Sequence, residues 1–285
     1  MPFSVGIEIE GVALSRATPS TKPLPTNVPA QLNLIADALS AAGMPARTYL
    51  PLSNRGLAPD YTIWNVAVDA TINNVTSDTS DSSSTSHYGF ELVSPIFYDT
   101  DATAWREVFC LGVRSVGNAV LWKTNSTGLH IHIGCGFGEQ FSLHGIKKIA
   151  MLCCLFEATI GKLMPTQCVE GNGTILSNRY NAKLYDLPLH GVYARILGAS
   201  STVEICELMN GAPGVTSHHG YSGSRFFKHD TIEFNQHTGT TNPEQMMSWI
   251  DFTIRFVKFA INTRYEEIWV LGDSVEELDK LVGLP

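Results

Sequence analysis

The sequence predicts one α+β domain, covering residues 1–285, around a mostly antiparallel sheet. Strand-like and helix-like segments interleave along the chain, and no internal repeat is visible. The strand-like segments alternate polar with apolar residues, which is typical of antiparallel strands with one covered face. A chain of 285 residues is also long enough to form a large core.

The first half of the chain carries three strand patterns and two helix patterns. Pro29 and Gly43 mark the start and the end of the first helix, because proline is tolerated in a first turn and glycine favours a helix end. The expected elements are a strand at 3–11, a loop at 15–29, a helix at 30–42, a strand at 62–72 ending near Asp69, a strand at 88–96 and a helix at 102–122.

The second half begins with a strand and is richer in helices. Ser142, Ser201 and Ser274 stand where helix N-caps are expected, the last two with glutamate three positions later. The expected elements are a strand at 127–134, a helix at about 142–163, an irregular stretch at 165–188, two short helices, the second from 201, a strand or hairpin at 225–236, a long helix at 243–263 and a final short helix.

A low-complexity segment, TSDTSDSSSTSH, occupies residues 76–87. Such a polar stretch buries too little apolar surface to offset the entropy lost on ordering. Because a strand pattern resumes at once, we expect a flexible Ser/Thr/Asp-rich loop inside the domain.

Net charge, hydropathy and cysteine content exclude some functional classes for this protein. The net charge of −8 argues against a nucleic-acid groove and against a polybasic membrane patch. The most apolar run, residues 149–160, contains Glu157 and is too short to span a bilayer, so it predicts a buried helix. With scattered cysteines and no signal-peptide pattern, a cytoplasmic protein is expected.

Two strands carry titratable side chains at alternate positions. Glu8 and Glu10 lie in GIEIE at 6–10, and His130 and His132 lie in TGLHIHIG at 127–134. Because side chains on a strand repeat every second residue, each pair is expected on one face, with the apolar spacers turned to the core. Each pair alone has an ordinary explanation: a solvated strand face for the glutamates, and buried hydrogen-bonded histidines for the other.

Two further strands place a carboxylate in an apolar run. Glu91 lies in YGFELVSPI and Glu233 in TIEFNQH. A charged group in such a strand needs a partner or a metal ion. Four strands that each offer carboxylate or imidazole therefore predict a divalent-cation site.

The motifs in their order resemble the amidoligase family, a branch of the carboxylate–amine ligases related to glutamine synthetase and glutamate–cysteine ligase. The resemblance runs from about residue 3 to about residue 262. It rests on GIEIE, W-x-V-x-x-D at 64–69, FELVSP at 90–95, TGLHIHIG and TIEFNQHTGT at 231–240.

This resemblance implies a curved antiparallel sheet with helices outside and an inner face lined by metal ligands, as in the glutamine synthetase catalytic domain. It also implies a reaction in which ATP phosphorylates a carboxylate and an amine attacks the acyl phosphate, with Mg²⁺ or Mn²⁺ as the metal. The implied metal ligands are Glu8, Glu10, Glu91, His130 and Glu233; the nucleotide contacts are His132, Arg179 and Arg225; and the catalytic residues are Asp69, Arg225 and Asn235.

Some of these roles have structural alternatives. Arg179 is equally a surface arginine, and Asp69 is equally an aspartate that caps the following turn. At residue 235 the chain departs from the family, which usually has arginine two residues after the last glutamate. Asn235 can only hydrogen-bond an anion, so the acyl substrate differs, Arg225 or Lys228 substitutes, or activity is reduced.

Three functions remain open on these grounds. The first is an ATP- and metal-dependent ligase that forms an amide or peptide-like bond from small-molecule or peptide substrates. The second is a metal-dependent amide hydrolase using the same Glu/His face, and the third is a catalytically impaired nucleotide-binding homologue. No nucleic-acid or membrane partner is expected, and a homo-oligomer is left open.

Overall fold

The structure is a computed structural model. It describes residues 2–15, 27–49, 59–69, 72, 89–100, 104–124, 127–136, 138–164, 175–180, 183–210, 221–222, 224–228 and 231–284. The predicted loop at 76–87 lies outside these residues, as does most of the predicted loop at 15–29.

The chain forms two compact units. The N-terminal unit comprises Gly6–Leu129 with Thr238–Met247, and the C-terminal unit comprises Met1–Val5, His130–His237 and Ser248–Pro285. Strands β1 (Ser4–Ser15) and β7 (Gly128–Gly134) and helix α6 (Pro243–Asn262) each pass through a boundary between the units. The prediction of a single domain is not tested by this division and stays a prediction.

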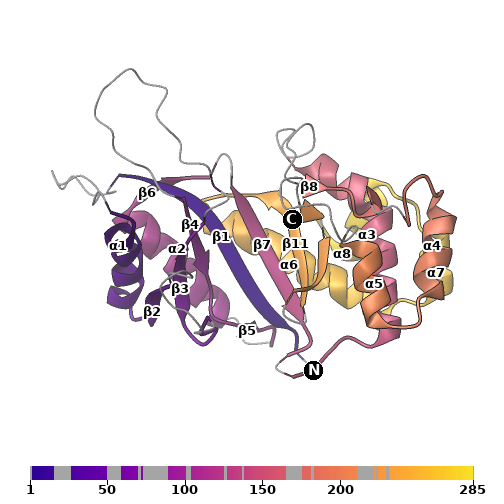
Figure 1. The fold of residues 1–285 in the computed structure, drawn as a ribbon, viewed down its shortest axis with the longest axis horizontal. Helices are drawn as coiled ribbons and strands as arrows, with labels where there is room; N and C mark the ends of the chain where they lie inside the picture. The colour runs from indigo at the N-terminus through magenta and orange to yellow at the C-terminus, as the bar shows by residue number, and fades with distance from the viewer. Residues whose placement is uncertain are drawn as a thin grey trace, which may run out of the picture. The chain divides into compact units, whose positions relative to one another are not determined.

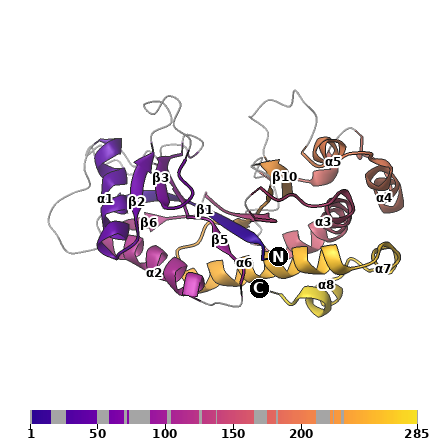
Figure 2. The same cartoon turned by 90° about the horizontal axis from the view of Figure 1, so that it is seen from below.

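The N-terminal unit packs two helices against a sheet (Figures 1 and 2). Helix α1 contacts α2 and strands β2 and β3. Asn27 begins α1 as its N-cap, with its Oδ1 accepting from the Ala30 N–H. Besides β1, the elements of this unit are α1 (Val28–Ala41), β2 (Ala46–Tyr49), β3 (Trp64–Val68), β4 (Gly89–Val93), β5 (Phe97–Tyr98), α2 (Ala104–Ala119) and β6 (Leu121–Lys123).

The C-terminal unit is centred on helix α3 (Leu143–Leu163), which contacts the 3-10 helix η2, α4, α5, α7 and α8. Helix α3 is buried continuously from Ile149 to Phe156, as the apolar run predicted. The other elements are β8 (Ile175–Leu176), η2 (Asn178–Tyr180), α4 (Leu189–Gly198), α5 (Thr202–Met209), β9 (Tyr221–Ser222), β10 (Ser224–Lys228), β11 (Thr231–Thr238), α7 (Tyr265–Val270) and α8 (Val275–Val282).

The main sheet is mixed and open, which confirms the α+β class. Its hydrogen-bonded order is β10-β11-β7-β1-β4-β3-β2, with β5 and β6 also paired to β1. The pairings of β1 with β4, β3 with β4 and β10 with β11 are antiparallel, but β2 runs parallel to β3. The glutamine synthetase-like curvature stays a prediction.

Several elements differ from the sequence prediction. The strand expected at 88–96 ends at Val93, shortly before Pro95, which lacks a backbone N–H for pairing, and the separate strand β5 follows it. The helix expected at 102–122 ends at Ala119, and Leu121 begins a strand instead. Strand β2 was not predicted. Among the described residues, no helix is long and apolar enough to cross a membrane.

Candidate functional site

The N-terminal unit carries a row of carboxylates on one face of its sheet. In the antiparallel register of β1 and β4, Glu10 lies opposite Glu91, so the two share a face. Glu8, two residues from Glu10, lies on that face beside Val93. All three glutamates are partly exposed, whereas the alternate Ile7 and Ile9 are fully buried. We call the side bearing Glu8, Glu10 and Glu91 the carboxylate face.

Ser94 fixes the register of this face. Its Oγ accepts a hydrogen bond from the Ile7 N–H at 3.1 Å and donates to the Pro95 carbonyl at 2.8 Å. The Ser94 N–H in turn donates to the Ile7 carbonyl at 2.9 Å. The serine of FELVSP therefore holds β1 beside β4, a role that sequence reasoning missed.

Glu10 also has a structural contact. The Gly128 N–H donates to its Oε2 at 2.6 Å, so this carboxylate holds the first residue of strand β7. A backbone N–H bonded to a carboxylate is a charge-assisted contact and is stronger than a neutral one. This hydrogen bond involves only one of the two carboxylate oxygens of Glu10, so it does not conflict with a ligand role.

Asp69 lies one residue beyond the end of β3, where it was expected. Its N–H donates to the Gly89 carbonyl at 3.3 Å, which continues the pairing of β3 with β4. Asn65 and Ala67 precede Asp69 at alternate positions, and Ala67 lies opposite Glu91. Asp69 thus occupies a position of the carboxylate face, two residues beyond Ala67.

In the C-terminal unit, one buried carboxylate lies close to two imidazoles. Oε1 of Glu233 is 3.8 Å from Nδ1 of His130 and 3.7 Å from Nε2 of His132. Only 1% of Glu233 and 7% of His132 is exposed. His132 Nδ1 is also 3.0 Å from the Thr231 hydroxyl, which orients the ring. We call His130, His132 and Glu233 the His–Glu cluster.

The separations in the His–Glu cluster fit a shared cation. Ligand atoms about 2.1 Å from one ion, at tetrahedral to octahedral angles, lie roughly 3–4 Å from one another. Imidazole nitrogen with carboxylate oxygen is a donor set that suits Mn²⁺ and other first-row divalent ions. The distance from Glu233 Oε1 to each imidazole nitrogen is therefore one that two ligands of the same ion can have.

Asn235, the departure from the family pattern, is 3% exposed. It stands two residues after Glu233 on β11, while the intervening Phe234 is fully buried. Arg225 occupies the position opposite Glu233 in the β10–β11 register, but its side chain is not among those described. Its predicted roles in catalysis and nucleotide binding stay predictions.

Arg179, in the 3-10 helix η2, contacts the segment that precedes α4. Its guanidinium donates to the Leu187 carbonyl at 2.5 Å. Burial raises the pKa of the nearby Glu157 carboxyl, an effect opposed by hydrogen bonds from Ser177 and Asn178 and by the charge of Arg179. The nucleotide role of Arg179 stays a prediction, and this partly buried arginine also connects η2 to the segment before α4.

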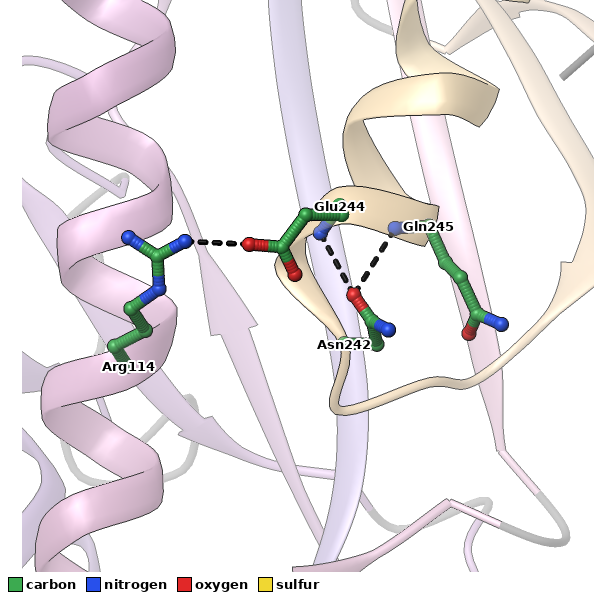
Figure 3. Close-up of polar contacts among 4 residues, drawn as sticks. All are labelled: Arg114, Asn242, Glu244 and Gln245. Carbon is green, nitrogen blue, oxygen red and sulfur yellow. Dashed lines mark hydrogen bonds and ion pairs between the residues drawn. The ribbon is translucent and has the colours of Figure 1, made fainter.

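The Gly-Thr pair after β11 connects helix α6 to the turn before β7. Gly239 N–H donates to the Thr127 carbonyl at 2.7 Å, and the Thr240 hydroxyl donates to Gln245 Oε1 at 2.7 Å. As Figure 3 shows, Asn242 Oδ1 accepts from the Glu244 and Gln245 N–H groups. The same Glu244 forms an ion pair of 2.5 Å with Arg114 of α2 (Figure 3).

The structure adds two polar residues to the carboxylate face that the sequence did not reveal. Arg47 and Tyr49 on β2 lie beside Asn65 and Ala67 of β3. Arg47 Nε donates to Asn65 Oδ1 at 2.9 Å. The short segment ARTY carries no periodic signal, so only the pairing with β3 could have identified these residues.

Comparison with known proteins identifies the family. A family model described as "Putative amidoligase enzyme" matches residues 2–183. No curated protein matches the chain, and no solved structure matches it. The matched residues include β1, β3, β4 and β7, and therefore every predicted ligand except Glu233. Since the match covers more than half of the 285 residues, the chain belongs to the amidoligase family.

Proposed function

We propose that the protein is an ATP- and divalent-metal-dependent ligase that joins a carboxylate to an amine. Family membership is the observation that carries the proposal, because amidoligases are ligases by description. The predicted glutamate and histidine ligands support the metal requirement, since donor atoms of Glu8, Glu91, Glu233 and the two histidines occur in groups that could hold a metal ion.

In the proposed reaction the substrate carboxylate attacks the γ-phosphorus of ATP, which gives an acyl phosphate and releases ADP. The amine then attacks the acyl carbon, phosphate leaves with the bonding electrons, and the amine loses a proton. Phosphoryl transfer is catalysed mainly by positioning and by neutralisation of charge. Mg²⁺ or Mn²⁺ would supply that neutralisation when bound by Glu8, Glu10, Glu91, His130 and Glu233.

The other predicted residues fit parts of this scheme. Asp69 would accept the amine proton or bind the ammonium group, because it lies on the carboxylate face at a strand end. His132, Arg179 and Arg225 would contact the phosphates. His132 lies next to Glu233, whereas Arg179 would have to exchange its contact with Leu187.

Two strands that carry predicted ligands continue across the division between the units. Leu129 and His130 are consecutive residues of β7 but belong to different units, and Val5 and Gly6 of β1 are divided in the same way. The strand that carries Glu8 and Glu10 and the strand that carries the histidines thus both run through the boundary.

ADP release tests the proposal. The full chain is incubated with ATP, Mg²⁺ or Mn²⁺, and pairs of amino acids or short peptides, and products are identified by mass spectrometry. We expect ADP and a condensed product together, and loss of both in Glu233→Gln. Glu207→Gln, which changes an exposed glutamate of α5, is the matched control.

The two alternatives give different results in this assay. A hydrolase would cleave amides with metal but without ATP. An impaired homologue, which the buried neutral Asn235 favours, would bind metal and ATP without releasing ADP for any substrate pair. Either result would overturn the ligase proposal.

A further inference from the structure

The segment that carries Arg179 is anchored to helix α3 by a single carboxylate. Glu157 follows directly after the long buried stretch of α3. Its Oε2 accepts from the Ser177 hydroxyl at 2.6 Å, and its Oε1 accepts from the Asn178 N–H at 2.5 Å. Each oxygen of this carboxylate therefore holds one residue of the segment 177–179, which we call the SNR turn.

The anchor continues to the backbone of Arg179. The Arg179 N–H donates to Ser177 Oγ at 3.1 Å, so the hydroxyl that donates to Glu157 also accepts from Arg179. A hydroxyl can donate and accept at the same time, and consecutive hydrogen bonds of this kind strengthen one another. Glu157 is thus connected to Arg179 through one side chain, that of Ser177.

The guanidinium of Arg179 has a different support. One of its N–H groups donates to the Leu187 carbonyl at 2.5 Å. A phosphate bound by this guanidinium would take the place of that carbonyl, since both are hydrogen-bond acceptors. The contacts with Glu157 involve the backbone and the hydroxyl of the SNR turn and not the guanidinium, so they persist when the contact with Leu187 is exchanged.

The surroundings of Glu157 differ from those that would best stabilise a purely structural anchor. Burial raises the pKa of its carboxyl, and the hydrogen bonds from Ser177 and Asn178 and the charge of Arg179 offset this effect only in part. A neutral side chain would avoid the cost of taking a charge out of water. A carboxylate perturbed by burial beside an arginine is a feature of many functional sites.

We propose that Glu157 is a positioning residue of the nucleotide site. Its carboxylate fixes the SNR turn, so that Arg179 is held for the phosphates of ATP when its guanidinium leaves Leu187. This inference rests on the proposed ligase function and adds to it a residue that acts on nucleotide binding without touching the nucleotide. Because Glu157 acts through Arg179, its loss should have no further effect on nucleotide affinity once Arg179 is absent.

A double-mutant cycle on nucleotide affinity tests this role without relying on turnover. The full chain with Mg²⁺ is titrated with β,γ-methylene-ATP in a calorimeter, as wild type, Glu157→Gln, Arg179→Gln and the double variant. We expect Arg179→Gln to weaken binding about tenfold or more, because it removes a charge-assisted contact. Glu157→Gln should weaken binding about three- to tenfold, and the double variant should match Arg179→Gln within about twofold.

Ser177→Ala tests the route from Glu157 to Arg179. This change removes the hydroxyl that joins the two residues and keeps the contact of Glu157 with the Asn178 N–H. It should weaken binding of the analogue about as much as Glu157→Gln does. Combining the two changes should weaken binding no further, because both interrupt the same connection.

Two controls separate positioning from general destabilisation. Glu207→Gln changes a half-exposed glutamate of α5, and Ile268→Val removes a methylene from the core of the same unit. Both variants should bind the analogue like the wild type. An equal loss of affinity in Ile268→Val and Glu157→Gln would overturn the proposal. Independent losses in the cycle, or an affinity of Glu157→Gln within about twofold of the wild type, would overturn it as well.

Failure of the ligase function gives a different result. If the wild type binds the analogue but releases no ADP with any substrate pair, the ligase proposal falls and the cycle still decides the role of Glu157. If the enzyme releases ADP and Glu157→Gln keeps the kcat and the KM of ATP, the positioning role falls while the ligase function stands. A wild type that does not bind the analogue overturns both.

Discussion

Single side chains in this protein combine a predicted chemical role with a structural one. Glu10 is the clearest case, because its carboxylate accepts the Gly128 N–H at 2.6 Å. The sequence predicted the acidic residue and its face from the alternation in GIEIE. It could not predict this contact, because Gly128 is 118 residues away.

The Glu10 contact predicts a graded response to mutation. Glu10→Ala leaves the Gly128 N–H without its acceptor, which should lower the free energy of unfolding by about 1–3 kcal/mol. Glu10→Gln keeps an acceptor oxygen and should lose less than half of that. Urea denaturation of both variants measures the difference. Equal losses would mean that the charge, and not the hydrogen bond, holds the strand.

Glu157 makes stability depend on pH. Burial raises the pKa of this carboxyl above the ordinary value of 4.5. Between the two pKa values the folded protein binds more protons than the unfolded chain, so the free energy of unfolding falls as pH rises through the folded pKa. Glu157→Gln, which cannot ionise, should therefore show a smaller fall between about pH 4.5 and pH 7 than the wild type.

Unfolding curves at several pH values provide the measurement for Glu157. Glu207→Gln is the control, because Glu207 is half-exposed on α5. If Glu157→Gln and the wild type have parallel pH profiles, the Glu157 carboxyl is not perturbed in the folded protein.

At the scale of elements, the sequence predicted correctly those strands and helix starts whose pattern lies within a few consecutive residues. The alternation in GIEIE and TGLHIHIG predicted β1 and β7, and the serines at 142, 201 and 274 cap helices as expected. Strand β2 was missed because all four of its residues are partly exposed, which removes the alternation. Its partner β3 begins 15 residues after β2 ends, and parallel pairing leaves no turn motif in the sequence.

Gly239, in the connection between β11 and α6, lies very close to the turn before β7. A Cβ at this position would lie 2.1 Å from Thr127 Oγ1 and 2.8 Å from Thr124 Cβ. Gly239→Ala should therefore force apart the connection to α6 and the turn before β7, and lower the free energy of unfolding by about 1–3 kcal/mol. Gly272→Ala, where no atom lies within 4 Å of the added Cβ, should stay within about 0.5 kcal/mol of the wild type.

Thermal and urea unfolding of the two glycine variants compare these effects directly. A loss in Gly272→Ala as large as that in Gly239→Ala would point to backbone flexibility and not to the contact with Thr127. The residues H-T-G-T at 237–240 belong to the last motif of the family resemblance, and the hydrogen bond from Gly239 to Thr127 gives this part of the motif a structural role.

At the scale of the whole molecule, the predicted metal ligands divide between the two units. Glu8, Glu10 and Glu91 belong to the N-terminal unit, whereas His130 and Glu233 belong to the C-terminal unit. Sequence spacing identified these residues because each interrupts an apolar strand. Assigning them to one ion or to several depends on long-range geometry, which the alternation within each strand does not contain.

Metal-linked stability distinguishes one joint site from separate sites. An ion that binds only the folded protein raises its stability by RT ln(1 + [L]/Kd), so the thermal midpoint should rise with Mn²⁺ concentration. In a joint site, Glu8→Gln and Glu233→Gln should each remove most of this rise, and the double variant should be little worse than either one. In separate sites the two losses should add, because independent sites are energetically uncoupled. The Mn²⁺ dependence of the four proteins, with Glu207→Gln as the control, therefore tests whether the carboxylate face and the His–Glu cluster hold the same ion.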